Sequence, residues 1–114
     1  MNLVVTEVSA TTAVVALPVD HLDAGNVKAF REAMQSVSSN YNTIVIDMGP
    51  LNFVDSSGLG ALLSCLRAMG VKNGHLRLFG MTKPVKALFE LVRMHRIFTI
   101  CGSREEALAE PVAA

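Results

Sequence analysis

The most informative segment of this sequence reads Leu-Asn-Phe-Val-Asp-Ser-Ser-Gly-Leu-Gly and runs from Leu51 to Gly60. Leu51 to Val54 is a short, largely apolar run typical of extended chain, and an amphipathic helix is predicted to begin at Ser56 or Ser57. The two serines therefore lie at a helix N-terminus, where unpaired backbone N–H groups and a partial positive charge favour an anion. We interpret this position as a site for a phosphorylated side chain rather than as an enzyme active site.

A simpler interpretation of Ser56 has to be weighed against this one. Asp55 or Ser56 could serve only as the helix cap, which is the usual role of such residues. However, Ser57 duplicates the hydroxyl, although one cap needs one side chain. Gly58 and Gly60 leave the first turn bare, although glycine costs a helix about 1 kcal/mol relative to alanine. Because a bare backbone lets another protein approach closely, we predict that these five residues form a partner-binding surface.

Strand and helix patterns alternate on both sides of this stretch. The run Val14–Leu17 is continuously apolar and is therefore expected to be a central strand. Alternation of strands with helices of 10–15 residues predicts an α/β domain with a mostly parallel, four- to five-stranded sheet and about four helices. The expected strands are Leu3–Val8, Ala13–Leu17, Thr43–Met48, Leu51–Val54, His75–Phe79 and Ile97–Ile100.

Each of the four helices is predicted from a start signal, and three of them also from an apolar stripe at three- and four-residue spacing. Their starts are placed at Asp23, at Ser56 or Ser57, at Thr82 and at Ser103, and Gly70 is expected to end the second helix. The apolar stripes are Val27, Phe30, Met34 and Val37 in the first helix, Leu59, Leu62, Leu63, Leu66 and Met69 in the second, and Val85, Leu88, Phe89 and Val92 in the third. We expect one domain over residues 1–110 and a loose tail over residues 111–114.

Composition excludes several classes of function. Ten Lys or Arg residues balance ten Asp or Glu residues in 114, so the surface offers no electrostatic basis for binding nucleic acid or an anionic membrane. Four basic residues gather around the third helix, but Glu90 interrupts them, which indicates an ordinary solvent-exposed face. These are Lys83, Lys86, Arg93 and Arg96.

The cellular compartment is predicted from what the sequence lacks. No apolar stretch approaches the ~18 residues of a membrane span, and no secretory signal pattern is found at the N-terminus. Cys65 and Cys101 lie 36 residues apart without metal-ligand spacing. We therefore expect reduced core cysteines in a cytoplasmic protein.

Enzymatic patterns are weak in this chain. Leu63 stands where a dinucleotide-binding loop needs its third glycine, no Walker-type motif is present, and neither serine has the glycines of a hydrolase nucleophile elbow. Asp20, His21 and Asp23 are a common turn composition rather than a metal site. We therefore expect no catalytic residue, cofactor or metal. A small hydrolase that pairs Ser56 with a histidine remains the least favoured alternative.

Several motifs resemble one known family. Ile44-Val45-Ile46-Asp47 followed by Leu51–Gly60 is similar to the signature of the STAS domain, and in particular to single-domain bacterial anti-anti-sigma factors, also called anti-sigma factor antagonists. Lys83–Leu91 resembles the third helix of that family, and Leu22-Asp23-Ala24 with Asn26 resembles the entry to its first helix. Together the matching stretches cover nearly the whole chain.

This resemblance implies a βα superhelical fold and a phosphorylation switch. The residue corresponding to the phosphorylated serine is Ser56, and Asp55, Ser57 and the Asp23 loop correspond to the partner-facing surface. The implied partner is an anti-sigma factor with a histidine-kinase-like ATPase fold, which phosphorylates the antagonist and thereby releases it. A PP2C-type phosphatase reverses the modification. The protein itself would then be a substrate and a switch, without catalysis of its own.

One departure from the family pattern leaves the partner open. Many members carry a Gly-Glu or Gly-Asp pair after the second strand, whereas residues 18–23 here read Pro-Val-Asp-His-Leu-Asp. The STAS fold also occurs in stressosome proteins and in lipid-trafficking ABC transporter complexes. The alternative function is therefore a subunit of a larger assembly, in which Ser56 is never modified.

Overall fold

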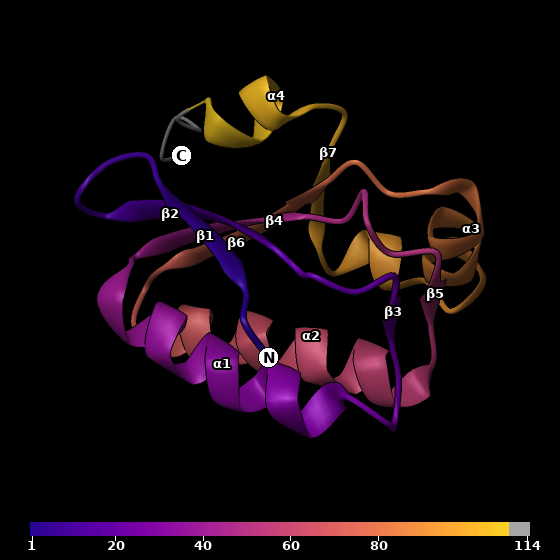
Figure 1. Ribbon diagram of the computed structural model, residues 1–114. Helices are drawn as coiled ribbons and strands as arrows, with labels where there is room; N and C mark the ends of the chain where they lie inside the picture. The colour runs from indigo at the N-terminus through magenta and orange to yellow at the C-terminus, as the bar shows by residue number, and fades with distance from the viewer. Residues whose placement is uncertain (110–114) are drawn as a thin grey trace.

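A five-stranded sheet forms the centre of the computed structural model, in which residues 1–109 are described (Figure 1). Its strand order is β1-β2-β4-β6-β7. β1 is antiparallel to β2, and the remaining pairs are parallel. The predicted α/β class and the mostly parallel sheet are thus confirmed. The strand bounds are Val4–Glu7 for β1, Thr12–Ala16 for β2, Thr43–Asp47 for β4, His75–Phe79 for β6 and Thr99–Cys101 for β7.

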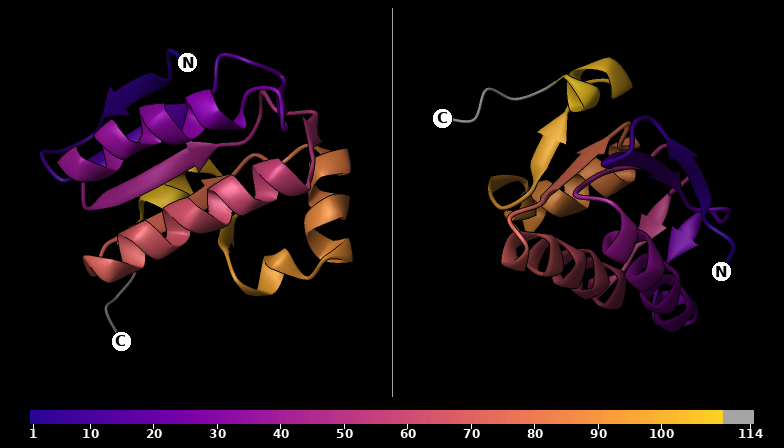
Figure 2. Two further views of the ribbon diagram at one scale, coloured as in Figure 1. Left: turned by 90° about the horizontal axis from the view of Figure 1, so that it is seen from below. Right: turned by 90° about the vertical axis from the view of Figure 1, so that its left-hand side faces the viewer.

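Within residues 1–109, four α-helices pack around the sheet, in agreement with the prediction of about four. α1 (Val27–Asn40) and α2 (Ser56–Val71) lie side by side against one face, and the short α4 (Arg104–Leu108) lies on the other (Figures 1 and 2). α3 (Lys83–Leu91) lies at one end of the sheet. The tail expected over Pro111–Ala114 lies outside the described residues.

The main core lies between the sheet and the pair α1 and α2. β2 and β4 each contribute three consecutive buried residues, as expected for central strands of a parallel sheet. On the opposite face a smaller cluster holds α4 in place, and Nη1 of the buried Arg77 donates to the Ala107 carbonyl at 2.9 Å. Within residues 1–109, no helix combines the length and apolar character needed to cross a bilayer.

A second, two-stranded sheet stands apart from the first. β3 (His21–Leu22) pairs in parallel with β5 (Phe53–Val54) in the register His21–Phe53 and Leu22–Val54. Leu22 and Val54 are buried, whereas Phe53 is exposed. Since paired residues of a sheet share a face, this small sheet presents His21 and Phe53 outward.

Two predicted helix boundaries are wrong. Asp23 does not cap the first helix, because α1 begins four residues later with Asn26 in the cap position. Gly70 does not end the second helix, since α2 continues to Val71. The chain turns instead at Asn73, which takes a left-handed φ of 59°.

The third helix and the last strand also differ from expectation. Thr82 occupies the cap position of α3, but its hydroxyl donates to the Leu51 carbonyl at 2.8 Å rather than capping the helix. Val92 is exposed and lies just beyond α3, so it does not extend the apolar stripe. The last strand begins at Thr99 instead of Ile97, because residues 94–96 form a 3-10 turn, η1 (Met94–Arg96).

Candidate functional site

The candidate site lies where α1 and α2 both begin, beside the small β3–β5 sheet (Figure 1). α1 follows β3 and α2 follows β5, so pairing of the two strands brings both helix N-termini to one end of the molecule. The Asp23 loop and the Asp55–Gly60 stretch, which are separated by some thirty residues in the chain, therefore meet there. A hydrogen bond between Asp55 and Ala24 joins them directly.

Asp55 is the residue that holds this junction together. One oxygen, Oδ1, accepts a hydrogen bond from the Gly58 N–H at 2.9 Å and so caps α2. The other, Oδ2, accepts from the Ala24 N–H at 3.1 Å, and the backbone N–H of Asp55 donates to the Leu22 carbonyl at 3.2 Å. These N–H donors, first of all that of Gly58, hold the pKa of the Asp55 carboxyl below its usual value. Asp55 is therefore an anionic link between α2 and the loop before α1.

Because Asp55 provides the cap, the side chain of Ser56 is not needed for that purpose. Ser56 is the first residue of α2 and is exposed, and Ser57 is half-buried. Neither hydroxyl has a hydrogen-bond partner among residues 1–109. Of the two residues that the simpler interpretation offered as the helix cap, Asp55 is the one that caps α2. Ser56 is thus an exposed residue in the first turn of α2 whose side chain is not used as the cap, as expected of a serine that can be modified.

Gly58 and Gly60 occupy different environments. An added Cβ on Gly58 would lie 2.3 Å from the Leu22 carbonyl oxygen and 2.9 Å from Val54 Cγ1, so only glycine fits between α2 and β3. At Gly60 the nearest atom is Arg31 Nη2 at 3.8 Å, which is an ordinary contact. The glycine at position 58 is therefore explained by packing inside the molecule.

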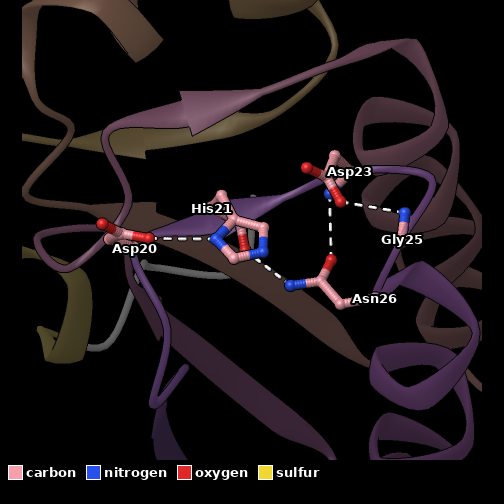
Figure 3. A network of polar contacts seen from close by, with 5 residues as sticks. All are labelled: Asp20, His21, Asp23, Gly25 and Asn26. Atoms are coloured by element: carbon pink, nitrogen blue, oxygen red, sulfur yellow. Dashed lines mark hydrogen bonds and ion pairs between the residues drawn. The ribbon is translucent and has the colours of Figure 1, made fainter.

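The Asp23 loop is organised by its own side chains (Figure 3). Oδ1 of Asp23 accepts from the Gly25 N–H at 2.9 Å, and its backbone N–H donates to Oδ1 of Asn26 at 3.0 Å. The side-chain amide of Asn26 donates in turn to the His21 carbonyl at 2.8 Å. The carboxylate of Asp23 therefore shapes a turn before α1, and the half-exposed Asp23 directly precedes Ala24, whose N–H donates to Asp55.

His21 and Asp20 form an ion pair at the surface of the same loop. Nδ1 of His21 lies 2.9 Å from Oδ1 of Asp20 (Figure 3). This hydrogen bond raises the pKa of His21 and lowers that of Asp20. Among residues 1–109, no three His, Cys, Asp or Glu side chains converge closely enough to hold a metal ion.

Nothing in the described geometry activates Ser56 as a nucleophile. A hydrolytic serine needs a base within hydrogen-bond reach, and within residues 1–109 no hydrogen bond joins Ser56 to a histidine. A cavity of about 210 Å³ between α1 and α2 is lined by Arg31, Ser64 and Cys65. Burial there raises the pKa of Cys65 to about 11, so this thiol is protonated at neutral pH.

Two features of the site were not anticipated from sequence. Asn26 was named only for its resemblance to the entry of the family's first helix; its hydrogen bonds to Asp23 and His21, which connect the loop, were not predicted. Phe53 is 55% exposed and lies beside His21, two residues before Asp55. The other four phenylalanines of the chain are buried, so this exposed ring marks the outer face of the small sheet. The adjacent apolar residues Phe53 and Val54 indicate that one of the two side chains faces outward, because successive strand residues point to opposite faces, but the sequence does not say which one.

Known proteins that resemble this chain are antagonists of anti-sigma factors. The anti-sigma F factor antagonist of Paenibacillus polymyxa is 31% identical over 67 residues, which is 59% of this chain and 57% of that protein. The anti-sigma-B factor antagonist of Listeria monocytogenes is 27% identical over 90 residues, covering 71% of this chain and 79% of that protein.

Solved structures show the same fold. The anti-sigma factor antagonist SpoIIAA in its unphosphorylated form superposes with a TM-score of 0.77 over 94% of this chain and 93% of its own, at 24% identity. The phosphorylated form of SpoIIAA from Bacillus superposes with a TM-score of 0.70 over 94% of this chain and 96% of its own, at 23% identity. The sequence profile of the STAS domain matches residues 4–107, and the chain therefore belongs to the STAS domain family.

Proposed function

We propose that this protein is an anti-sigma factor antagonist controlled by phosphorylation of Ser56. In the unphosphorylated state it binds an anti-sigma factor and so frees a sigma factor for transcription. Phosphorylation of Ser56 by the anti-sigma factor, which is a serine kinase with a histidine-kinase-like ATPase fold, releases the antagonist. A PP2C-type phosphatase restores it, and the protein itself performs no catalysis.

The observation that carries this proposal is that Ser56 is an exposed residue at the start of a helix that Asp55 already caps. A phosphoryl group there leaves the cap hydrogen bond intact. It would also be favoured by the partial positive charge of the α2 N-terminus. The fold is therefore expected to tolerate the modification.

The effect on a partner follows from charge. Phosphorylation adds about −1.5 to −2 charges at neutral pH. Asp55 keeps its own charge, because its lowered pKa leaves it ionised. Asp23 adds a second carboxylate on the linked loop. A partner that fits a neutral hydroxyl would then face a dianion beside two carboxylates, which can cost several kcal/mol of binding free energy.

The family relatives support the choice of partner. Relatives from Paenibacillus polymyxa and Listeria monocytogenes are named for antagonism of anti-sigma factors. By this analogy the partner-binding surface comprises Asp23, Asp55, Ser56 and Ser57, with Gly58 and Gly60 shaping the backbone of the first turn. We also propose that the domain spans residues 1–110 and acts in the cytoplasm.

A paired binding experiment tests the switch. Ser56→Ala and Ser56→Asp are used as baits in a lysate of the native organism, and the retained proteins are identified by mass spectrometry. We expect an ATPase of the histidine-kinase type on the Ala bait and its loss from the Asp bait. The purified ATPase should then transfer phosphate from ATP to the wild-type chain at Ser56 and fail to do so with Ser56→Ala.

A charge control separates the switch from a general effect of an added carboxylate. Ser36 is exposed in the middle of α1, away from the site, so Ser36→Asp adds the same charge elsewhere. This variant should retain the ATPase. If both Ser56 baits hold the same partners, and these are transporter or scaffold proteins, the phosphorylation switch is wrong. The alternative, a STAS subunit of a larger assembly, then takes its place.

A further inference from the structure

Phe53 is an exposed aromatic side chain close to the candidate phosphorylation site. It has 55% of its surface exposed, whereas the other four phenylalanines of the chain are at most 6% exposed. The neighbouring Val54 is buried against the core, and successive strand residues point to opposite faces. Phe53 therefore projects from the outer face of the small β3–β5 sheet.

The backbone that carries the ring is fixed on both sides of Phe53. The Asn52 N–H donates to the Asp20 carbonyl at 2.7 Å, and the Asp55 N–H donates to the Leu22 carbonyl at 3.2 Å. A phenylalanine side chain has few rotatable bonds, so little conformational entropy is lost when a partner fixes the ring. The molecule thus presents this aromatic group in advance of binding.

Charged groups lie on both sides of the ring. The ion pair of Asp20 and His21 belongs to the neighbouring strand and the loop before it (Figure 3), and Asp55 follows Phe53 by two residues. An apolar group inside a polar rim is typical of a binding hot spot, because the rim excludes water from the central contact. Single exposed apolar residues are nevertheless common on protein surfaces, so the position relative to Ser56 decides between the two interpretations.

The short distance from Phe53 to Ser56 places the ring within the footprint of a protein that binds at Ser56. Three residues of extended chain span at most about 10 Å. A specific interface buries about 800 Å² on each partner, which corresponds to a disc of roughly 16 Å radius. Val71 is even more exposed, at 87%, but it lies at the far end of α2, about 22 Å from Ser56 along the helix axis. A partner centred on Ser56 therefore covers Phe53 and leaves Val71 free.

We propose that Phe53 is the apolar anchor by which the anti-sigma factor kinase recognises this chain, and that its ring enters an apolar pocket beside the kinase active site. The inference rests on the proposed function and adds to it a residue that determines affinity. Burial of an aromatic ring supplies binding free energy that a serine hydroxyl and exposed carboxylates do not. Water excluded by the ring also makes a charge on phosphorylated Ser56 more costly to bury, which strengthens the switch.

A second copy of this chain is a less suitable occupant of the surface. A two-fold symmetric contact through Phe53 places the same patch of each copy against the other. The carboxylate of Asp55, which its lowered pKa keeps ionised, and that of Asp23 would then approach their own counterparts. Such like-charge contacts oppose association, whereas a kinase that receives Ser56 has no such constraint.

Calorimetric titration of the unphosphorylated full chain with the purified ATPase that the Ser56→Ala bait retains tests the inference. Phe53→Ala should weaken binding at least roughly tenfold. Phe53→Leu, which keeps a large apolar side chain, should lose less affinity, and Val71→Ala should bind like the wild type. With ATP, Phe53→Ala should raise KM for phosphorylation of Ser56 by a similar factor and leave kcat unchanged, because the ring contributes to binding and not to phosphoryl transfer.

A measurement on the wild-type chain excludes a folding defect as the cause. A neutral gadolinium chelate broadens the NMR signals of exposed protons. It should broaden the ring protons of Phe53 in the free protein but not in the ATPase complex, and the methyl protons of Val71 in both.

The outcomes separate this inference from the proposed function. If the ATPase phosphorylates Ser56 and is lost from Ser56→Asp, but binds Phe53→Ala as tightly as the wild type or leaves the ring exposed, the inference is wrong and the proposed function stands. If the Ser56→Ala bait retains no ATPase of this type, the proposed function is wrong and the inference falls with it.

Discussion

Replacing Gly58 with alanine tests the tightest backbone contact of the site. The new Cβ would lie 2.3 Å from the Leu22 carbonyl oxygen and 2.9 Å from Val54 Cγ1. The carbonyl cannot swing away like a flexible side chain, because it belongs to β3 and accepts a hydrogen bond from the Asp55 N–H. Relief of the clash therefore requires α2 and β3 to separate.

The expected magnitude combines two opposing terms. Overpacking of a well-packed interior costs about 1–3 kcal/mol and sometimes more. Alanine recovers up to about 1 kcal/mol because it is a better helix former than glycine. With a backbone atom at 2.3 Å the first term is at its upper end, so we expect a net loss of about 2 kcal/mol in the free energy of unfolding. For a domain of this size the melting temperature should fall by roughly 10 °C.

Gly60→Ala is the matched control within the same helix turn. The added Cβ would lie 3.8 Å from Arg31 Nη2, an ordinary van der Waals distance. The higher helix propensity of alanine is therefore not offset by a steric clash. We expect this variant to be more stable than the wild type by up to about 1 kcal/mol. Urea unfolding followed by circular dichroism, together with thermal unfolding, measures both. If Gly58→Ala equalled or exceeded Gly60→Ala in stability, the close approach of α2 to β3 would be refuted.

Three further predictions concern other parts of the chain. Arg93 has a left-handed φ of 62°, a conformation that costs an L-residue about 1–2 kcal/mol. Glycine adopts this conformation freely but loses more backbone entropy on folding, so Arg93→Gly should raise the free energy of unfolding by about 0.5–1 kcal/mol in urea titrations. The pKa of Asp55 is lowered in the folded protein, so its carboxylate stabilises the fold above about pH 4 and loses this effect as the pH falls through the folded pKa. Asp55→Asn should therefore have a lower free energy of unfolding than the wild type at pH 7, and this difference should shrink in acid. A difference that stayed constant with pH would contradict the charge-based link. Burial raises the pKa of Cys65 to about 11, so less of its thiol is ionised at pH 8 in the folded than in the unfolded protein. In a Cys101→Ser background, Cys65 should react with a disulfide reagent at pH 8 roughly 100-fold more slowly in the folded than in the urea-unfolded protein. Equal rates would contradict its burial.

Local patterns were enough to predict the regular elements that are buried on a regular period. His75–Phe79 matches β6 residue for residue, and α2 begins at Ser56, one of the two starts that were predicted. The apolar stripe of the first helix was also correct, with Phe30, Met34 and Val37 buried. In each case the helix or strand propensity, the spacing of the apolar residues and the tertiary packing favour the same structure. The local sequence is therefore sufficient to predict that helix or strand.

The errors arose where a side chain found a distant partner. Thr82 was expected to cap α3, but its hydroxyl donates a hydrogen bond to the Leu51 carbonyl, thirty-one residues away in the chain. Asp23 was expected to cap α1, but it bonds to Gly25 and leaves the cap position to Asn26. Sequence spacing indicates which residues can cap a helix, whereas the folded structure decides which acceptor is nearest.

The amino-acid sequence was sufficient to predict the α/β class, the mostly parallel sheet and a helix that starts at Ser56 or Ser57. It also determined the family, because the motif around Asp55 is specific. The folded structure was needed to show that Asp55 joins α2 to the loop before α1 and that the close approach of β3 requires glycine at position 58. The physical reason is that these features are contacts between segments far apart in the chain, whose formation depends on how the strands pair rather than on any local pattern.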